Sequence, residues 1–194
     1  MTLAHSLAFL READKLKSVL RRTRVSFDHE RRENDAEHSW HLALMAMVLR
    51  EYAPPNLDLL AVVRMVLVHD LVEIDAGDTF LYDDDPTKDE REARAADRLF
   101  GLLEEPLRSE LRGAWEAFEA RRTPEARFAR ALDRFQPMMQ NFYTEGASWR
   151  AHGITAAQVR AKNGPIIREG APELWAYAET LLADAVGRGW LAEQ

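Results

Sequence analysis

Apolar residues in the first twenty positions recur at steps of three and four, the spacing of one face of an α-helix. A polar stretch, 21–33, follows them and is rich in arginine, with threonine, serine and aspartate, and the spacing does not persist there. We therefore predict a connecting loop over 21–33, preceded by a first helix whose apolar positions are Leu3, Leu7, Leu10, Ala13, Leu16 and Leu20.

A helix-start signal follows this loop. Asn34 precedes Glu37 by three residues, as in a capping box, so we predict a second helix to about Tyr52, where two consecutive prolines break the chain. The segment 57–73 contains valines that would suit a buried strand. Because it is longer than a usual strand, we predict a third helix, capped by Asn56.

Glycine, proline and capping residues divide the rest of the chain. Gly77 marks the end of the third helix, and Asp83–Pro86 is a loop. Further helices are predicted from Thr87 to about Gly101, from Pro106, from Pro124 to about Tyr143, from Thr155 to about Arg168, and from Pro172 to about Val186. No internal repeat or long linker is visible. We predict one all-α domain over residues 1–194, with its core at about 7–168 and a C-terminal helix at about 172–187.

The amino-acid composition restricts which catalytic groups, metal ligands and partners are possible. The chain has no cysteine, and its 26 Lys and Arg against 33 Asp and Glu give a formal net charge of −7. Thiolate catalysis and cysteine-ligated metals are therefore excluded, and any metal must be held by histidine and carboxylate. The acidic balance argues against a nucleic-acid duplex as partner. The longest apolar run, 57–68, is too short to cross a bilayer, and no signal-peptide pattern is present, so no membrane is implied and we expect a cytoplasmic protein.

The stretch from His69 to Asp78 carries several ionisable residues in an otherwise apolar segment. Glu73 lies four residues after His69 and three after Asp70, so helical spacing places it beside both. A divalent cation between helices would explain why these charges are tolerated. A solvated helix end, with His69 hydrogen-bonded in the core, explains them equally well when they are taken alone.

Two residues elsewhere extend this pattern. His38 lies near the first turn of the second helix, and Asp133 is a carboxylate within an apolar helix. Pro137 cannot donate a backbone hydrogen bond to the carbonyl of Asp133, so a kink there would turn Asp133 inward. A surface aspartate paired with Arg130 or Arg134 is the alternative for Asp133 alone.

The ionisable residues thus occur in a recognisable order: His38, then His69-Asp70, then Glu73, then Gly77-Asp78, then Asp133. This set, on separate helices of an all-α chain, resembles the HD superfamily of metal-dependent phosphohydrolases. Within it, the set resembles the 5′-deoxynucleotidase branch, which includes the HD domain-containing protein 2 group. The stretch from Leu16 to Arg21 is similar to the family segment that ends in a phosphate-binding arginine. The resemblance extends from about Leu7 to about Arg168.

The resemblance implies a single HD-domain bundle of about seven to nine helices, commonly dimeric, and it implies roles by position. Glu73 and Asp78 match acidic residues needed for catalysis, and Arg21 matches the residue that holds the substrate phosphate. The implied activity is hydrolysis of deoxynucleoside or ribonucleoside 5′-monophosphates to nucleoside and phosphate by metal-bound water. Four residues match the metal ligands: His38, His69, Asp70 and Asp133.

One divalent transition metal ion per chain is expected at these ligands. Dinuclear members of the superfamily need further histidines before the final aspartate, and none occurs between Asp70 and Asp133. Two imidazoles and two carboxylates suit Mn, Co, Fe, Ni or Zn, so the identity of the metal stays open.

Other interpretations remain. Arg22 stands where some bacterial deoxynucleotidases have tryptophan, so the choice between deoxyribose and ribose is open, as is the base. There are two alternatives to this function. The substrate is another phosphomonoester or nucleotide, or the chain is a non-catalytic, metal-stabilised regulatory or binding protein. The arginines of 121–134 alternate with acidic residues, which favours a solvated helix over a nucleic-acid surface. We expect His41 to pack or to support the site rather than to bind metal.

Overall fold

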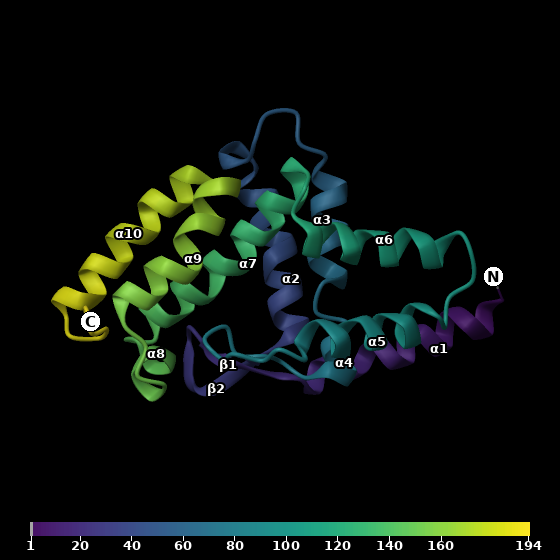
Figure 1. Cartoon of the computed structure of the whole chain (residues 1–194), viewed down its shortest axis with the longest axis horizontal. Helices are drawn as coiled ribbons and strands as arrows, with labels where there is room; N and C mark the ends of the chain where they lie inside the picture. Colours follow the sequence, from purple (N-terminus) through teal and green to yellow (C-terminus); the bar gives the residue numbers. More distant parts are fainter. Residues whose placement is uncertain (1) are drawn as a thin grey trace.

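The computed structural model describes residues 2–194, and most of them are helical (Figure 1). Strands β1 (Leu20–Val25) and β2 (Asp28–Asn34) form one antiparallel hairpin, and 3₁₀ turns cover Asp14–Ser18 and Arg50–Tyr52. The α-helices are α1 (Leu3–Ala13), α2 (Asp35–Val48), α3 (Leu59–Val68), α4 (Glu73–Ala76), α5 (Lys88–Phe100), α6 (Leu107–Ala120), α7 (Pro124–Tyr143), α8 (Ala147–Ala151), α9 (Ala156–Gly170) and α10 (Pro172–Gly187). The predicted all-α class is confirmed.

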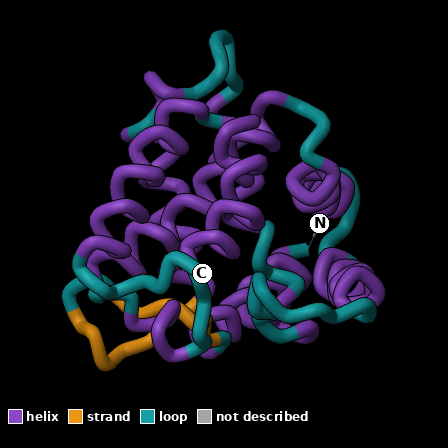
Figure 2. The backbone as a smooth tube through the Cα atoms, turned by 60° about the vertical axis from the view of Figure 1, so that its left-hand side comes forward, coloured by secondary structure: helices purple, strands orange, loops and turns teal. Residues whose placement is uncertain are grey.

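The hairpin corrects the prediction of a polar loop over 21–33. Its strands carry charged residues on both faces, so they lack the apolar alternation that signals a strand. Arg32 helps to hold the hairpin by donating to the backbone carbonyls of Leu20 and Arg21. Leu20 is a strand residue and not part of the first helix, because α1 ends at Ala13. In Figure 2 the hairpin lies at one end of the helical layers.

The helix starts around the hairpin are partly as predicted. Asn34 and Glu37 form the expected capping box at the start of α2, with Asn34 Oδ1 accepting from the Glu37 amide over 2.9 Å. The prediction that Asn56 caps the third helix is wrong, because Asp58 accepts from the amides at its start. The third helix also ends sooner than predicted. A turn over residues 69–72 separates α3 from α4, so Glu73 begins a helix of its own.

Helix α7 lies at the centre of the bundle. It packs against α2, α3, α6, α9 and α10, and its side chains fill much of the larger core cluster. A second, smaller cluster lies between α1, α5 and the end of α3. Four side chains on α6 and α10 are buried in these cores: Trp115, Phe118, Trp175 and Leu182. Among residues 2–194, no helix has the length and apolar character that crossing a membrane requires.

Candidate metal centre and active site

The two cores leave a polar centre where α2, the end of α3 and α7 approach one another. His38 comes from α2, His69 and Asp70 follow α3, and Asp133 comes from the middle of α7. His38 Nε2 lies 3.2 Å and His69 Nε2 lies 3.7 Å from Asp133 Oδ1, and one donor atom from each of these residues lies within 4.8 Å of the others. Asp70 Oδ1 lies 3.1 Å from His69 Nε2. The structure therefore brings together all four predicted ligands.

The two imidazoles are held in the orientation that metal binding requires. His69 donates from Nδ1 to the carbonyl of Val66 over 2.9 Å, and His38 donates from Nδ1 to Oε1 of Gln136 over 3.1 Å. Each Nε2 is therefore the ring nitrogen that faces the carboxylates, and it would bind a metal ion once its proton is displaced. His69 Nε2 is buried and has no hydrogen-bond partner among the described residues. A divalent cation fits this donor set, since it would satisfy that nitrogen and the surrounding carboxylates together.

Charge also favours a cation here. Burial disfavours a charged imidazole, but Asp70 and Asp133 raise the pKa of His69 to about 10. Burial raises the pKa of Asp133, but its hydrogen bond to His38 and the neighbouring imidazole of His69 keep that pKa well below the usual range. The centre therefore holds a proton on an imidazole when no metal is bound, and a metal ion would take the place of that positive charge.

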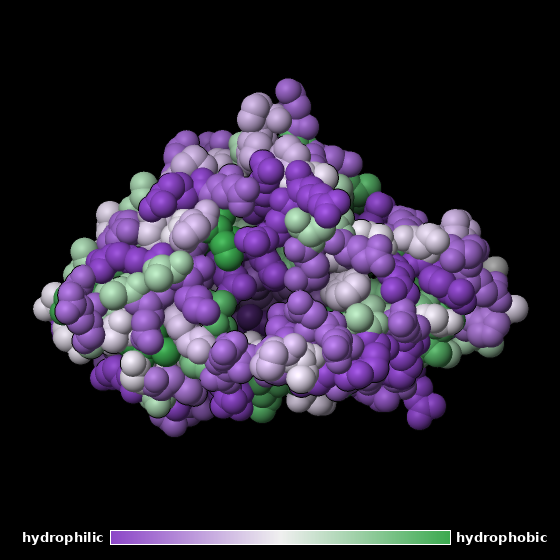
Figure 3. Space-filling model, in the orientation of Figure 1, coloured by the Kyte–Doolittle hydropathy of each residue, from purple (hydrophilic) through white to green (hydrophobic). Residues whose placement is uncertain are grey.

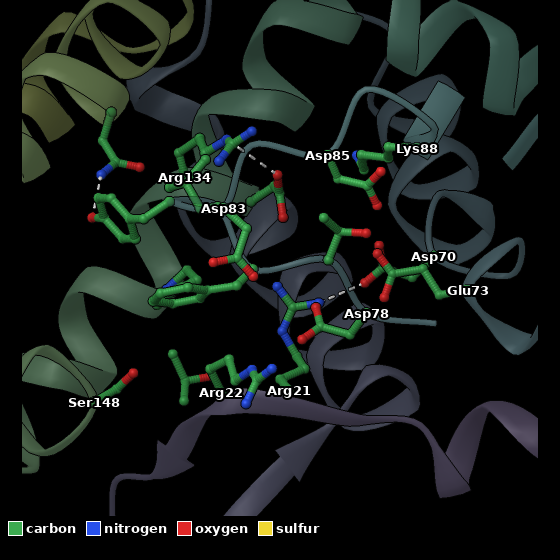
Figure 4. A pocket seen from close by; sticks show the side chains of 18 of the residues that line it. Arg21, Arg22, Asp70, Glu73, Asp78, Asp83, Asp85, Lys88, Arg134 and Ser148 are labelled. Atoms are coloured by element: carbon green, nitrogen blue, oxygen red, sulfur yellow. Dashed lines mark hydrogen bonds and ion pairs between the residues drawn. The ribbon is translucent and has the colours of Figure 1, made fainter. Parts of the chain in front are cut away.

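Arg21 extends from β1 to the edge of this centre, and Figure 4 shows its ion pair with Asp70. Nη1 donates to Asp70 Oδ2 over 2.8 Å and to Asp35 Oδ1 over 3.1 Å, and Nε lies 3.8 Å from Glu33 Oε2. These carboxylates fix the guanidinium beside a predicted metal ligand. Because Arg21 also lines the pocket, it lies where a bound phosphate would meet both groups.

A second acidic group lies beside Arg21. Oxygen atoms of Asp35, Glu73 and Asp78 lie within 4.8 Å of one another. Burial and the neighbouring carboxylates Asp70 and Asp35 raise the pKa of Glu73 well above its usual range, and burial raises the pKa of Asp78. Burial and Asp70 raise the pKa of Asp35 to about 7. Carboxyl groups that stay protonated near neutral pH are suited to proton transfer.

These groups form one end of a cavity of about 360 Å³. Figure 3 shows it as a hollow near the centre of one face, with mostly hydrophilic residues around its mouth. Figure 4 shows Ser148 across the cavity from Asp70 and Glu73, and its neighbour Trp149 lines the cavity together with Phe80, Tyr82, Asn141 and Asn163. The cavity therefore joins a charged end to an aromatic end.

Several residues of the centre were not predicted from the sequence. Gln136 and Glu33 both lie beside Nδ1 of His38, and Asp35 pairs with Arg21. Gln136 follows Asp133 by three residues on α7, so its place on the same helix face was available from spacing alone. His41 lies in this outer layer, with Nδ1 3.3 Å from the Gln136 amide nitrogen, and it is outside the group of three possible ligands formed by His38, His69 and Asp133.

Comparison with known proteins agrees with this arrangement. The sequence model of the HD domain family matches residues 13–175. The chain belongs to the HD domain family. The structure also superposes on the crystal structure of a predicted metal-dependent phosphohydrolase from Magnetospirillum magnetotacticum MS-1 with a TM-score of 0.93 and 52% sequence identity, covering 98% of this chain and 95% of the other.

Sequence relatives of this HD domain chain include proteins named 5′-deoxynucleotidase. The human protein, 5′-deoxynucleotidase HDDC2, is 35% identical over 136 residues, which cover 69% of this chain and 65% of the relative. The yeast protein, 5′-deoxynucleotidase YGK1, is 28% identical over 149 residues, which cover 73% of this chain and 67% of the relative. The match thus spans slightly less than two thirds of the human protein. The expected resemblance to the HD superfamily is confirmed.

Proposed function

We propose that this HD domain chain is a metal-dependent phosphohydrolase that releases phosphate from deoxynucleoside 5′-monophosphates. One observation carries the proposal: the His38, His69, Asp70 and Asp133 group, the acid Glu73 and the cation Arg21 meet at one end of a cavity whose other end is aromatic. The names of the human and yeast relatives support the same class of substrate.

Each part of the charged end has a task in this reaction. The two histidines with Asp70 and Asp133 would hold a divalent cation, which would polarise phosphate oxygens and lower the pKa of a water molecule. Arg21 binds phosphate oxygens through its planar fork. Glu73, buried beside Asp70, holds a proton that it can donate to the leaving 5′-oxygen. Asp78 lies beside Glu73 and helps to keep its carboxyl protonated.

The aromatic end suits a nucleoside. Phe80, Tyr82 and Trp149 offer flat apolar surfaces for a base, and the side-chain oxygen of Asn163 offers an acceptor for its edge. Arg22 lies over the Phe80 ring with its guanidinium carbon 6.0 Å from the ring centroid. We propose that Arg22, beside this aromatic lining, contributes to the choice between deoxyribose and ribose.

One metal ion per chain is proposed for the histidine-containing group. The carboxyls of Asp35, Glu73 and Asp78 form a second group of possible ligands, but the raised pKa of Glu73 favours a proton there. Metal analysis of protein that has not been depleted should give one equivalent, whose identity is Mn, Co, Fe, Ni or Zn. Two equivalents would contradict this part of the proposal.

We also propose a cytoplasmic homodimer. Four large apolar side chains on α2 and α3 are largely exposed: Trp40 (63%), Met47 (52%), Val48 (66%) and Leu60 (63%). These two helices pack together, so the four residues offer an apolar surface to a second copy of the chain. Light scattering after size exclusion tests the dimer, and a Trp40→Glu variant should shift it toward the monomer. A wild-type monomer at micromolar concentration would contradict the proposal.

The test of the activity is a substrate panel. Deoxy- and ribonucleoside 5′-monophosphates are incubated with the protein and Mn²⁺, Co²⁺, Fe²⁺, Ni²⁺ or Zn²⁺, and released phosphate is measured beside an Asp70→Ala control. We expect wild-type protein to release phosphate from deoxynucleotides. In the Asp70→Ala control the rate of phosphate release should fall by ~10²-fold or more, since Asp70 contacts Arg21 and is a predicted metal ligand. If wild-type protein released no phosphate from any member of the panel, the proposal would be overturned.

A further inference from the structure

Three buried or half-buried arginines border the charged end of the cavity, and two of them donate hydrogen bonds to carboxylates from their terminal nitrogens. Arg21 donates to Asp70 and Asp35. Arg130 donates to Glu119 over 2.9 Å and to Asp133 over 3.5 Å, and its guanidinium lies 4.5 Å from the centroid of the Phe118 ring. These contacts explain why both arginines lie where they do without any ligand.

Arg134 is different. It follows Asp133 on α7, lines the same cavity and has a side chain that is 19% exposed. Among residues 2–194 its guanidinium donates no hydrogen bond, and its one ionic partner, Asp133 Oδ2, is 3.8 Å from Nε. A guanidinium has five N–H donors, and a half-buried guanidinium that donates no hydrogen bond is costly. The packing thus holds a cation in the cavity wall and leaves its donors unused.

The position of Arg134 indicates what it would bind. Figure 4 shows Arg134 and Arg21 on different sides of the cavity, Arg134 at the upper left and Arg21 at the lower centre. They come from different elements, α7 and β1, and each lies beside a predicted metal ligand, Asp133 and Asp70. An anion bound at the metal group would therefore have Arg134 on one side and Arg21 on the other.

We propose that Arg134 forms a second anion subsite, which binds the phosphate group of the ligand opposite Arg21. The planar fork of its guanidinium matches two phosphate oxygens, which a lysine ammonium does not. The identity of the anion as a nucleotide phosphate rests on the proposed function, but the subsite itself requires only phosphate. A substrate phosphate would thus be held by two arginines and the metal group, with the nucleoside toward Phe80 and Trp149.

The experiment measures binding of inorganic phosphate to Mn²⁺-loaded protein by calorimetry, at saturating metal. Arg134→Gln is compared with Arg127→Gln, which removes an arginine from the same helix where it pairs with Glu169 outside the cavity. We expect Arg134→Gln to weaken phosphate binding by about 10- to 100-fold, the worth of hydrogen bonds between charged groups, and Arg127→Gln to leave it unchanged. Metal content and the far-ultraviolet circular dichroism spectrum are measured for each variant.

The outcomes separate this inference from the proposed function. Phosphate affinity in Arg134→Gln within about twofold of wild type, or an equal loss in Arg127→Gln, overturns the subsite. Should Arg134→Gln lose metal or structure, Arg134→Lys decides: it keeps the charge and loses the fork, so a several-fold weaker affinity is expected and an unchanged one overturns the proposal. Wild-type protein that binds phosphate through Arg134 but hydrolyses no nucleotide would refute the proposed activity and leave the subsite standing.

Discussion

Gln136, on α7, accepts a hydrogen bond from Nδ1 of His38, on α2, over 3.1 Å. Its amide nitrogen in turn donates to Glu33 Oε1 over 2.7 Å, and Glu33 also accepts from Gln140 over 2.6 Å. This chain of contacts fixes the direction of the amide and, through it, the tautomer of His38. The hairpin that the sequence did not predict therefore reaches the metal centre through Glu33 at the end of β2.

The first prediction concerns Gln136. Replacing it with Met removes the acceptor for His38 while retaining most of the volume, so the imidazole loses its fixed orientation. We expect the affinity for Mn²⁺ to fall by about 10- to 100-fold, as is usual when such a supporting contact is removed. Gln140→Met is the matched control, because Gln140 contacts Glu33 but not His38. Calorimetric titration that gave equal affinities for Gln136→Met and wild type would count against this role.

The second prediction concerns pH. In the metal-free protein the carboxylates of Asp70 and Asp133 outweigh burial and raise the pKa of His69 from 6.5 to about 10. This raised pKa stabilises the metal-free fold fully below about pH 6.5, and the contribution is lost as the pH rises through about 10. Because a metal must displace the proton, its affinity should increase over the same interval.

Titration of Mn²⁺ into metal-free protein at pH 7.5, in two buffers with different heats of ionisation, measures this displacement. The difference in heat should correspond to release of about one proton or more per metal bound. A Thr155→Ala variant, altered at the α9 cap far along the chain from the ligands, should release the same number. Metal uptake without proton release would be incompatible with a protonated His69.

The elements of the fold that could be predicted from the sequence are those formed by residues close together along the chain. The Asn34–Glu37 capping box and the Pro124–Tyr143 helix are formed by residues a few positions apart, and both were predicted correctly. The hairpin was missed because its polar strands are held by arginine contacts with backbone carbonyls and not by an apolar face. The break after Val68 was missed because apolar spacing continues through a turn.

The same distinction applies to the centre. His38, His69-Asp70 and Asp133 were identified from their order and from the resemblance it carries. The contact between Gln136 and His38 joins residues 98 positions apart, and pairing of Arg21 with Asp70 joins residues 49 positions apart. Such contacts depend on how helices pack, so a single sequence contains no direct signal for them.

The third prediction concerns Glu73. A Glu73→Gln change keeps the size of this buried side chain and removes its ability to exchange a proton. We expect metal content to stay at the wild-type level and phosphate release to fall by ~10²-fold or more. Asp75→Asn is the control, since Asp75 lies on the same short helix but is exposed and pairs with Arg98. Full activity in Glu73→Gln would remove Glu73 from the proton-transfer role.

The last prediction concerns the packing that holds α7 in place. A Cβ on Gly170, at the end of α9, would overlap the backbone carbonyl oxygen of Arg127 and press on Ala131, both on α7. Backbone cannot yield as a flexible side chain does, so Gly170→Ala should lower the free energy of unfolding by about 1–3 kcal/mol. Because Asp133 lies on the same helix, metal affinity should fall with it.

Gly113, inside α6, is the matched control. A Cβ there meets no atom within 4 Å and the residue is exposed, so Gly113→Ala should stabilise the protein by about 0.5–1 kcal/mol through the unfolded state. Urea denaturation of both variants measures the two effects, which have opposite signs. A Gly170→Ala protein as stable as wild type would mean that α9 can move away from α7 at little cost, and that the centre does not depend on this contact.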